Sequence, residues 1–361
     1  MSSADNGAAP TGPAAFEKAI AATQSVASFD EDEMTPLRRV QHFLHANPTA
    51  IPAIVLVLAI VLFSAIAGSK FLHPFNFSLV LQQVTIIGIV GVAQTLIILT
   101  AGIDLSVGAI MVLSSVVMGK LAIDSGLPVP FAFGLGLLTG LICGGINGLL
   151  VTRLRLPPFI VTLGTWSIFF ALNLWYSGSE SIRSQDLAAN AAFLQFTGTA
   201  FKIGLARITY GSVLMLALFG LFWYILNWTS FGRHLYAIGD DPEAAKLAGI
   251  RTDKMLLAIY MIAGLICAIA GWALIGRIGS VSPQSGYTAN LDSITAVVIG
   301  GTSLFGGRGS ILGTLIGALI VGVFRNGLAL SGVDVLWQEF AVGVLIIVAV
   351  AIDQWLRRVS A

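Results

Sequence analysis

The chain has 361 residues, of which 56% are hydrophobic and only 10% are charged. Soluble domains carry about 25% charged residues, because polar groups must cover their surface, so this composition excludes an ordinary soluble protein. The formal net charge of +1 offers no basic field for nucleic acid, and the two cysteines lie in long apolar runs without the spacing of a metal site or a disulfide framework.

The N-terminal segment 1–47 is polar and rich in small residues, with an acidic cluster at 30–33. No apolar run follows Met1 closely, which argues against a secretory signal peptide. Because this segment offers few large apolar residues for a core, we expect a disordered cytoplasmic tail over 1–47. The remainder, 48–358, is expected to form the transmembrane domain.

Ten segments of the chain are long and apolar enough to be considered as membrane helices. Such a helix needs about 20 predominantly apolar residues. The sequence therefore predicts an all-α, polytopic integral membrane protein. The eighth segment is short and lies between two Gly-rich stretches, so it is either a full span or a re-entrant segment. The segments are 50–68, 79–100, 105–123, 129–151, 158–176, 209–228, 255–275, 292–303, 309–325 and 336–356.

The distribution of Lys and Arg predicts the orientation. With the N-terminus in the cytoplasm, twelve basic residues fall on cytoplasmic segments and seven on external ones. Positive residues favour the cytoplasmic side of a membrane, so both termini are expected there. The longest cytoplasmic loop is then 229–254.

An internal similarity suggests an inverted repeat. Asn147-Gly148-Leu149 ends the fourth predicted span and Asn326-Gly327-Leu328 ends the ninth, and a glycine follows each asparagine after seventeen residues. An offset of five spans is odd, so the two copies would cross the membrane in opposite directions. Inverted repeats are common in transporters, with the pathway at their interface. The match is short, and chance similarity is the alternative.

One acidic residue, Asp104, separates the second and third predicted spans within the segment Gly102–Gly108. A carboxylate at membrane depth is costly and suggests a role in the translocation pathway. The alternative is that Asp104 caps the third helix by accepting backbone N–H groups near Ser106. The two roles are compatible. Gly102 and Gly108 would permit a helix break or a close backbone approach.

The sequence shows no group that would couple transport to a proton gradient or to ATP hydrolysis within this chain. Apart from Asp104, the predicted spans carry almost no central ionisable groups, and no GxxxxGK[ST] phosphate loop occurs. Proton-coupled carriers usually need acidic or His relays in the membrane, and an ATPase needs a phosphate loop. If the chain drives uphill transport, the energy should come from another subunit. Of the four histidines only His42 and His45 lie close together in the sequence, which is too little for a metal site, and no cluster of His, Asp or Glu suggests an enzyme.

A short helix is predicted inside the cytoplasmic loop. Asp241 can cap it, Pro242 suits its first position, Glu243 its first turn, and Gly249 its end. Its small residues are Ala244, Ala245 and Ala248. This helix is either an insertion element for a partner protein or an ordinary capped surface helix.

Three motifs resemble those of the permease subunits of the ribose/xylose/arabinose/fructose class of bacterial ABC sugar importers. The resemblance covers about residues 45–358. The motifs are the segment Gly102–Gly108, the segment Gly239-Asp240-Asp241-Pro242-Glu243-Ala244-Ala245 and the Gly-rich run 300–309. Residue 241 is Asp where the family frequently has Asn, and both residue types cap helices well.

The resemblance implies the pore subunit of an ATP-driven, binding-protein-dependent importer of a fructose- or ribose-like monosaccharide, in the bacterial inner membrane. It also implies a second copy of the permease, a cytoplasmic two-cassette ATPase that binds 239–249, and a periplasmic sugar-binding protein. No catalytic role, cofactor or metal is expected. A secondary carrier for a small polar solute is the alternative.

Candidate residues for the pathway or a helix break are Gly102, Asp104, Ser106, Gly108 and Asn147. We expect the path to be polar and poor in charge. Each further candidate for its lining has helix-packing hydrogen bonds as the alternative role. These further candidates are Gln82, Gln83, Thr85, Gln94, Ser114, Ser115, Thr162, Thr165 and Asn173.

Overall fold

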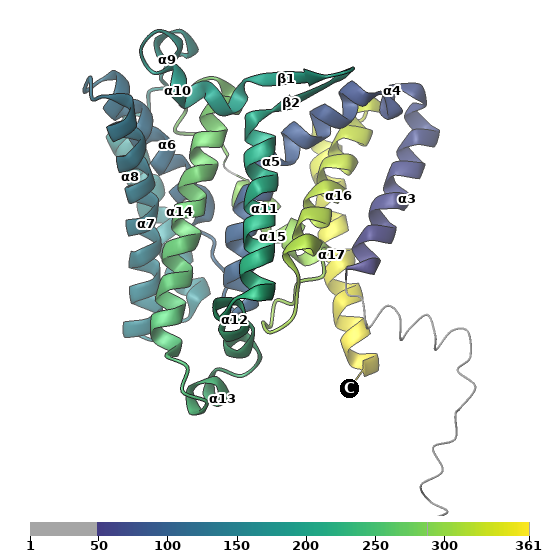
Figure 1. The fold of residues 1–361 in the computed structure, drawn as a ribbon. Helices are drawn as coiled ribbons and strands as arrows, with labels where there is room; N and C mark the ends of the chain where they lie inside the picture. Colours follow the sequence, from purple (N-terminus) through teal and green to yellow (C-terminus); the bar gives the residue numbers. More distant parts are fainter. Residues whose placement is uncertain (1–48, 287, 361) are drawn as a thin grey trace, which may run out of the picture. The chain divides into compact units, whose positions relative to one another are not determined.

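The computed structural model describes residues 49–286 and 288–360. The predicted tail over 1–47 lies outside these residues. Ten helices in the described part of the chain correspond to the ten predicted spans (Figure 1). They are α3 (Ala50–Ala67), α5 (Pro74–Leu99), α6 (Val107–Ile123), α7 (Val129–Arg153), α8 (Pro158–Ser177), α11 (Tyr210–Trp228), α14 (Thr252–Ile278), α15 (Ala289–Ile299), α16 (Ile311–Leu330) and α17 (Val335–Ser360).

Seven of these helices are long and apolar enough to cross a membrane, and the shorter apolar helices are Val107–Ile123, Ala289–Ile299 and Val335–Leu345. The all-α, polytopic fold class is therefore confirmed. Helix α15 has only 11 residues. At 1.5 Å per residue it is about 16 Å long, roughly half of the 30 Å hydrocarbon core of a bilayer.

The remaining elements are short. Helix α4 (Ser69–Leu72) links α3 to α5, and α12 (Ser230–Asp240) and α13 (Pro242–Leu247) fold from the loop after α11. The segment between α8 and α11 is structured. It contains α9 (Ser184–Asn190), α10 (Ala192–Gln195), the 3-10 turn η2 (Phe196–Gly198) and the antiparallel strands β1 (Ala200–Ile203) and β2 (Ala206–Thr209). Figure 1 shows α13 and the β1–β2 hairpin at opposite ends of the long helices.

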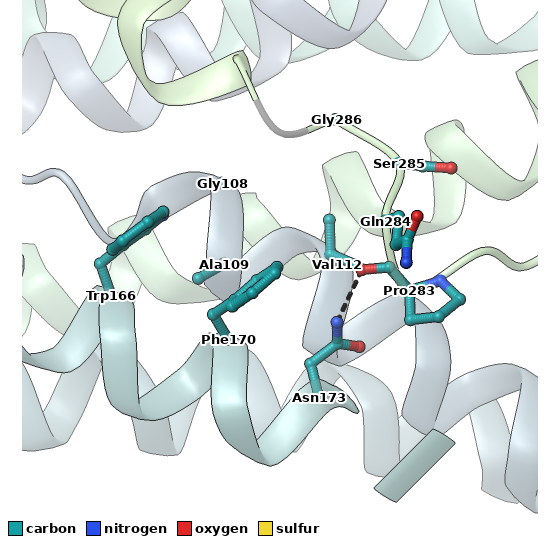
Figure 2. Close-up of a pocket in the computed structure, with 10 residues that line it drawn as sticks. All are labelled: Gly108, Ala109, Val112, Trp166, Phe170, Asn173, Pro283, Gln284, Ser285 and Gly286. Carbon is teal, nitrogen blue, oxygen red and sulfur yellow. Dashed lines mark hydrogen bonds between the residues drawn. The ribbon is translucent and has the colours of Figure 1, made fainter. Parts of the chain in front are cut away.

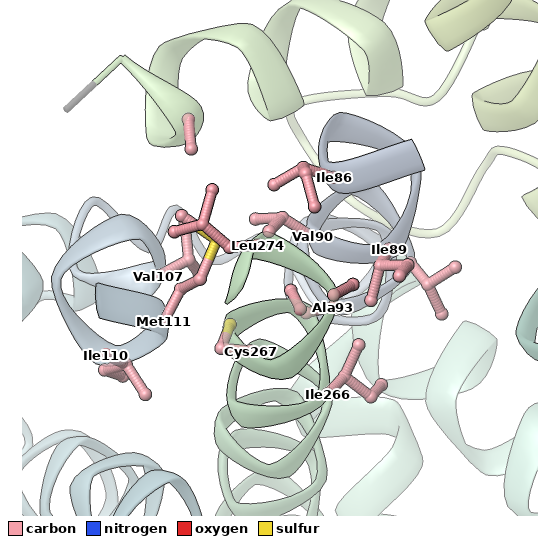
Figure 3. Packing of buried hydrophobic residues seen from close by; sticks show 14 of the residues in the cluster. Ile86, Ile89, Val90, Ala93, Val107, Ile110, Met111, Ile266, Cys267 and Leu274 are labelled. Carbon is pink, nitrogen blue, oxygen red and sulfur yellow. The ribbon is translucent and has the colours of Figure 1, made fainter. Parts of the chain in front are cut away.

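The core is formed where α5, α6 and α14 meet. Figure 3 shows Ala93 of α5, Met111 of α6 and Cys267 of α14 among the side chains gathered there, and all three are buried. Both cysteines are free and buried, in agreement with a packing role. The outward faces of α7, α8 and α11 instead expose large apolar side chains, as expected for helices that face lipid.

Glycines bring α7 and α14 into backbone contact. A Cβ atom added to Gly264 would lie 2.1 Å from the carbonyl oxygen of Gly140, and one added to Gly144 would lie 2.1 Å from the carbonyl oxygen of Tyr260. Without a hydrophobic driving force between membrane helices, such close approach is a main source of their association.

The helix arrangement supports the inverted repeat. Asn326 follows Asn147 by 179 residues, and nearly the same offset carries α5, α6, α7 and α8 onto α14, α15, α16 and α17. The contact between α7 and α14 is matched by a contact between their counterparts in the other repeat, α16 and α5. Helices α5 and α14 run in opposite directions, because Arg277 near the end of α14 reaches the carbonyl of Gln83 in the first half of α5, and the hydroxyl of Tyr260 in the first half of α14 lies beside Gly102, just after α5.

Candidate functional site

The linker between α5 and α6, residues 100–106, carries the predicted pathway residue Asp104. Its carboxylate is 2% exposed, and Oδ1 accepts hydrogen bonds from the Ser106 backbone N–H at 2.7 Å and from Ser106 Oγ at 2.6 Å. Helix α6 begins at the next residue, Val107. The carboxylate thus holds the turn that leads into α6, whose N-cap residue is Ser106 and which has no side-chain cap bond of its own. The capping interpretation is met in this indirect form, while the role of Asp104 in translocation stays a prediction.

The same linker is held by side chains from several helices. Thr162 of α8 donates to the carbonyl of Ile103 at 3.0 Å, and Gln94 of α5 donates to that of Asp104 at 2.7 Å. From α7, Asn147 Nδ2 donates to Ser106 Oγ at 2.8 Å. The irregular backbone therefore finds polar partners in protein, which is the condition for non-helical chain at membrane depth.

The linker between α14 and α15, residues 279–286 and 288, is the counterpart of 100–106 in the second repeat, and each linker packs against the start of the helix that follows the other. Asn290 at the start of α15 donates to the carbonyl of Leu105 at 3.2 Å. A Cβ on Gly108 would lie 3.5 Å from the Asn290 nitrogen and 3.6 Å from the Gly286 oxygen. Broken segments that meet between repeats are typical of transporter pathways.

A small cavity lies beside this meeting point, between α6, α8 and residues 283–286. Figure 2 shows Trp166 and Phe170 of α8 on one side, and Asn173 donating to the carbonyl of Pro283 at 2.8 Å. The cavity volume is about 20 Å³. That is enough for a water molecule and far too little for a sugar.

Two of the three motifs singled out in the sequence, 239–245 and 300–309, converge at the end of α5, just before the third motif begins at Gly102. A Cβ on Gly239 would lie 1.8 Å from the carbonyl oxygen of Leu99 and 2.6 Å from the Gly307 nitrogen. The Gly307 N–H donates to that same Leu99 carbonyl at 3.0 Å. On the other side, a Cβ on Gly306 would lie 2.8 Å from the Ala101 nitrogen. We call the contact between Leu99–Ala101, Gly239–Asp240 and Gly306–Gly307 the backbone joint.

A side-chain hydrogen bond reinforces the backbone joint. Tyr236 of α12 donates from its hydroxyl to the carbonyl of Gly309 at 2.9 Å. Burial raises the pKa of the Tyr236 phenol above its ordinary value, so the group stays protonated and keeps its proton for donation. Helix α12 and the Gly-rich turn are thus connected through both backbone and side chain.

Helix α13 continues from the backbone joint into solvent. The Asp241 carboxylate accepts the backbone N–H groups of Glu243 and Ala244 at 2.9 and 3.0 Å, and Pro242 occupies the first position. The predicted cap is therefore present, and Gly249 follows the helix with a φ of 87°. Leu247 at its end is 89% exposed.

A larger cavity lies between α5, α14, α15, α16 and α17, with a volume of about 440 Å³. Its polar lining includes Gln83, Arg277, Asp292, Arg325 and Gln338. Arg325 Nη2 lies 2.9 Å from Asp292 Oδ1. This cavity is large enough for a small polar solute.

Comparisons with known proteins agree with a transport role. A family model described as "branched-chain amino acid transport system / permease component" matches residues 76–350. The chain belongs to this permease family. It is 60% identical, over 96% of both chains, to a fructose import permease protein of Rhizobium meliloti. It is 41% identical to a ribose import permease protein of Bacillus subtilis (strain 168), over 82% of this chain and 89% of that one. A ribose import permease protein of Escherichia coli (strain K12) is 34% identical, over 83% and 92%.

No solved structure matches the chain. The comparisons therefore show that this chain is a multi-pass import permease, the pore subunit of an ABC importer.

Most polar residues proposed for the permease pathway form hydrogen bonds within the protein, as the packing alternative expects, and their role in the pathway stays a prediction. Gln83 lines the larger cavity and Asn173 the smaller one. Gln82 donates to the carbonyl of Arg207, and Thr85 bonds Ser212. Others with hydrogen bonds to the chain are Gln94, Ser115, Asn147, Thr162 and Thr165. Ser114 is buried in the described part of the permease with no partner for its hydroxyl.

The charged lining of the larger cavity was missed. In the predicted orientation, Arg277 and Arg325 fall among the seven external basic residues, because each lies near the predicted end of a span. Asp292 is the first residue of the eighth segment. The available signal was that two ionisable residues, Arg277 and Asp292, flank the Gly-rich stretch before this short segment. The expected charge-poor lining does not describe this cavity of the permease.

Proposed function

We propose that this permease is the pore subunit of an ATP-driven, binding-protein-dependent importer of a monosaccharide, with fructose as the first candidate. The observation that carries the proposal is the 60% identity over 96% of both chains to a protein named a fructose import permease. The relatives named for ribose lie at 41% and 34%. The proposed location is a bacterial inner membrane, with both termini in the cytoplasm.

The proposed assembly contains two copies of the permease, a cytoplasmic ATPase with two cassettes and a periplasmic sugar-binding protein. The exposed apolar faces of α7, α8 and α11 support contact with lipid or with a second copy. Because the pathway candidates Gly102–Gly108 and Asn147 lie where the two linkers pack against the starts of α6 and α15, a rearrangement there would change access to the pore.

The proposed docking element for the ATPase is α13 with its flanking residues, Gly239–Gly249. Only Ala245 of the helix is buried, and Leu247 stands in solvent. Fully burying a Leu side chain contributes about 1.5–3 kcal/mol, so a partner that covers Leu247 gains affinity from it. Motion of α13 would reach α5 through α12 and the backbone joint, because Gly239 and Leu99 touch through backbone atoms that cannot rotate aside.

The test is a mild detergent extraction of the tagged permease, followed by mass spectrometry of the co-purifying proteins. A two-cassette ATPase is expected in the eluate and is expected to be lost in Leu247→Asp. The matched control is Leu205→Asp, which changes a Leu that is 68% exposed in the turn of the β1–β2 hairpin. Equal recovery of the ATPase with both variants would contradict docking at α13. A permease that purifies alone and moves solute alone would support a secondary carrier.

A further inference from the structure

The cavity of about 440 Å³ has three ionisable residues in its lining, Arg277, Asp292 and Arg325. Five helices contribute to its lining, and its volume falls within the range of about 300–1,000 Å³ that is usual for small-molecule sites. Its apolar residues, such as Ile86 and Leu274, alternate with amide and charged groups. This mixture of apolar walls and a few polar groups is typical of ligand sites.

The Arg325 guanidinium is fixed but incompletely bonded. Its Nη2 contacts Asp292 Oδ1 at 2.9 Å and Glu339 Oε1 at 3.1 Å. Thr288 Oγ1 donates to the second Asp292 oxygen at 3.1 Å. The Arg325 Nε atom is buried and has no partner among the described residues. A buried donor without an acceptor costs about 1–3 kcal/mol, so this atom favours an acceptor from outside the chain.

The opposite wall offers further groups with spare capacity. Arg277 Nη1 donates to the Gln83 backbone carbonyl at 3.0 Å, and no described carboxylate forms an ion pair with Arg277. Within 49–286 and 288–360, no residue hydrogen-bonds the side-chain amide of Gln83. Donors and acceptors that the protein does not satisfy are thus gathered around one cavity.

We propose that this cavity is a transit site for a neutral monosaccharide on the permease itself, which gives the pore a selectivity of its own. The inference rests on the proposed function. Guanidinium N–H groups and a glutamine amide match the donors and acceptors of adjacent sugar hydroxyls. The two arginines, Arg277 and Arg325, are balanced by the carboxylates of Asp292 and Glu339, so the site has no net charge and suits a neutral solute. Arg325 is already neutralised by two carboxylates, which weakens its attraction for an anion.

The binding test uses the full-length permease purified in detergent, with fructose as the probe and saturation-transfer NMR as the readout. Gln83→Leu removes the amide and keeps the size of the side chain. We expect it to weaken fructose binding about tenfold, the loss that one net hydrogen bond accounts for. Gln82→Leu is the matched control, since Gln82 is the adjacent residue and bonds Arg207 rather than lining the cavity. Binding equal to wild type is expected for this control.

Two results would overturn the transit site. The first is equal fructose binding by Gln83→Leu and Gln82→Leu. The second is tighter binding of gluconate, an anionic probe of similar size, than of fructose. Uptake distinguishes this failure from failure of the importer function. If wild-type proteoliposomes accumulate fructose with ATP and Gln83→Leu does so with an unchanged KM, the transit site is rejected and the importer stands.

Discussion

Gly239→Ala is the sharpest perturbation of the backbone joint. The added Cβ atom would lie 1.8 Å from the Leu99 carbonyl oxygen and 2.6 Å from the Gly307 nitrogen. Both neighbours are backbone atoms, so no side chain can rotate away to make room. The end of α12 must therefore move away from α5, at a cost of about 1–3 kcal/mol for an overpacked contact.

A cost of about 1–3 kcal/mol corresponds to a shift of about 5- to 150-fold in the equilibrium between the formed and the separated joint. If the joint transmits motion from α13 to the pore, the variant should still bind the ATPase but take up less sugar for each ATP hydrolysed. The assay is proteoliposomes with enclosed ATP and fructose-loaded binding protein outside, with sugar accumulation and phosphate release measured together.

Gly220→Ala is the control for Gly239→Ala, because a Cβ at Gly220 of α11 meets nothing within 4 Å. It should behave as wild type. Recovery of ATPase with Gly239→Ala shows that the variant has folded. Wild-type accumulation of sugar per ATP in Gly239→Ala would refute the role of the joint in coupling.

Three further variants test other parts of the structure. Asp104→Asn should keep the thermal unfolding midpoint in detergent near wild type, since an amide oxygen still accepts from Ser106. Asp104→Ala should lower stability by about 1–3 kcal/mol. Equal unfolding midpoints for the two variants would argue against the capping role. Tyr236→Phe removes the bond to the Gly309 carbonyl and should cost about 1 kcal/mol by the same measurement, and no change would show that the bond is dispensable. Gly264→Leu should abolish monodisperse elution because α7 and α14 touch there, while Gly164→Leu, at an open position, should not; normal elution of both would contradict the close packing.

The helices and the α13 cap were predictable because their signals are local. An apolar run of about 20 residues is read from consecutive positions, and all ten predicted spans contain a helix. Asp241 and Pro242 are neighbours in the chain, so the capping pattern needs no knowledge of the fold. The repeat was visible through Asn147 and Asn326 because its spacing of 179 residues is a property of the sequence.

The sites built from distant segments were not predictable in the same way. Leu99 belongs to none of the three motifs, yet its carbonyl is the atom that Gly239 and Gly307 approach. Its role depends on how three separate segments pack. Likewise, Arg277 and Arg325 looked like external charges, and only the packing of α14 against α5, and of α15 against α16, brings them to one cavity with Asp292.

The central claim is tested most directly by fructose accumulation in proteoliposomes that contain the permease, its co-purified ATPase and the periplasmic binding protein. With ATP enclosed, labelled fructose should accumulate above its external concentration, and omission of the ATPase or of ATP should abolish accumulation. Leu247→Asp in the permease should do the same. Accumulation by the permease alone, indifferent to ATP and abolished by an uncoupler, would contradict the account and identify a secondary carrier.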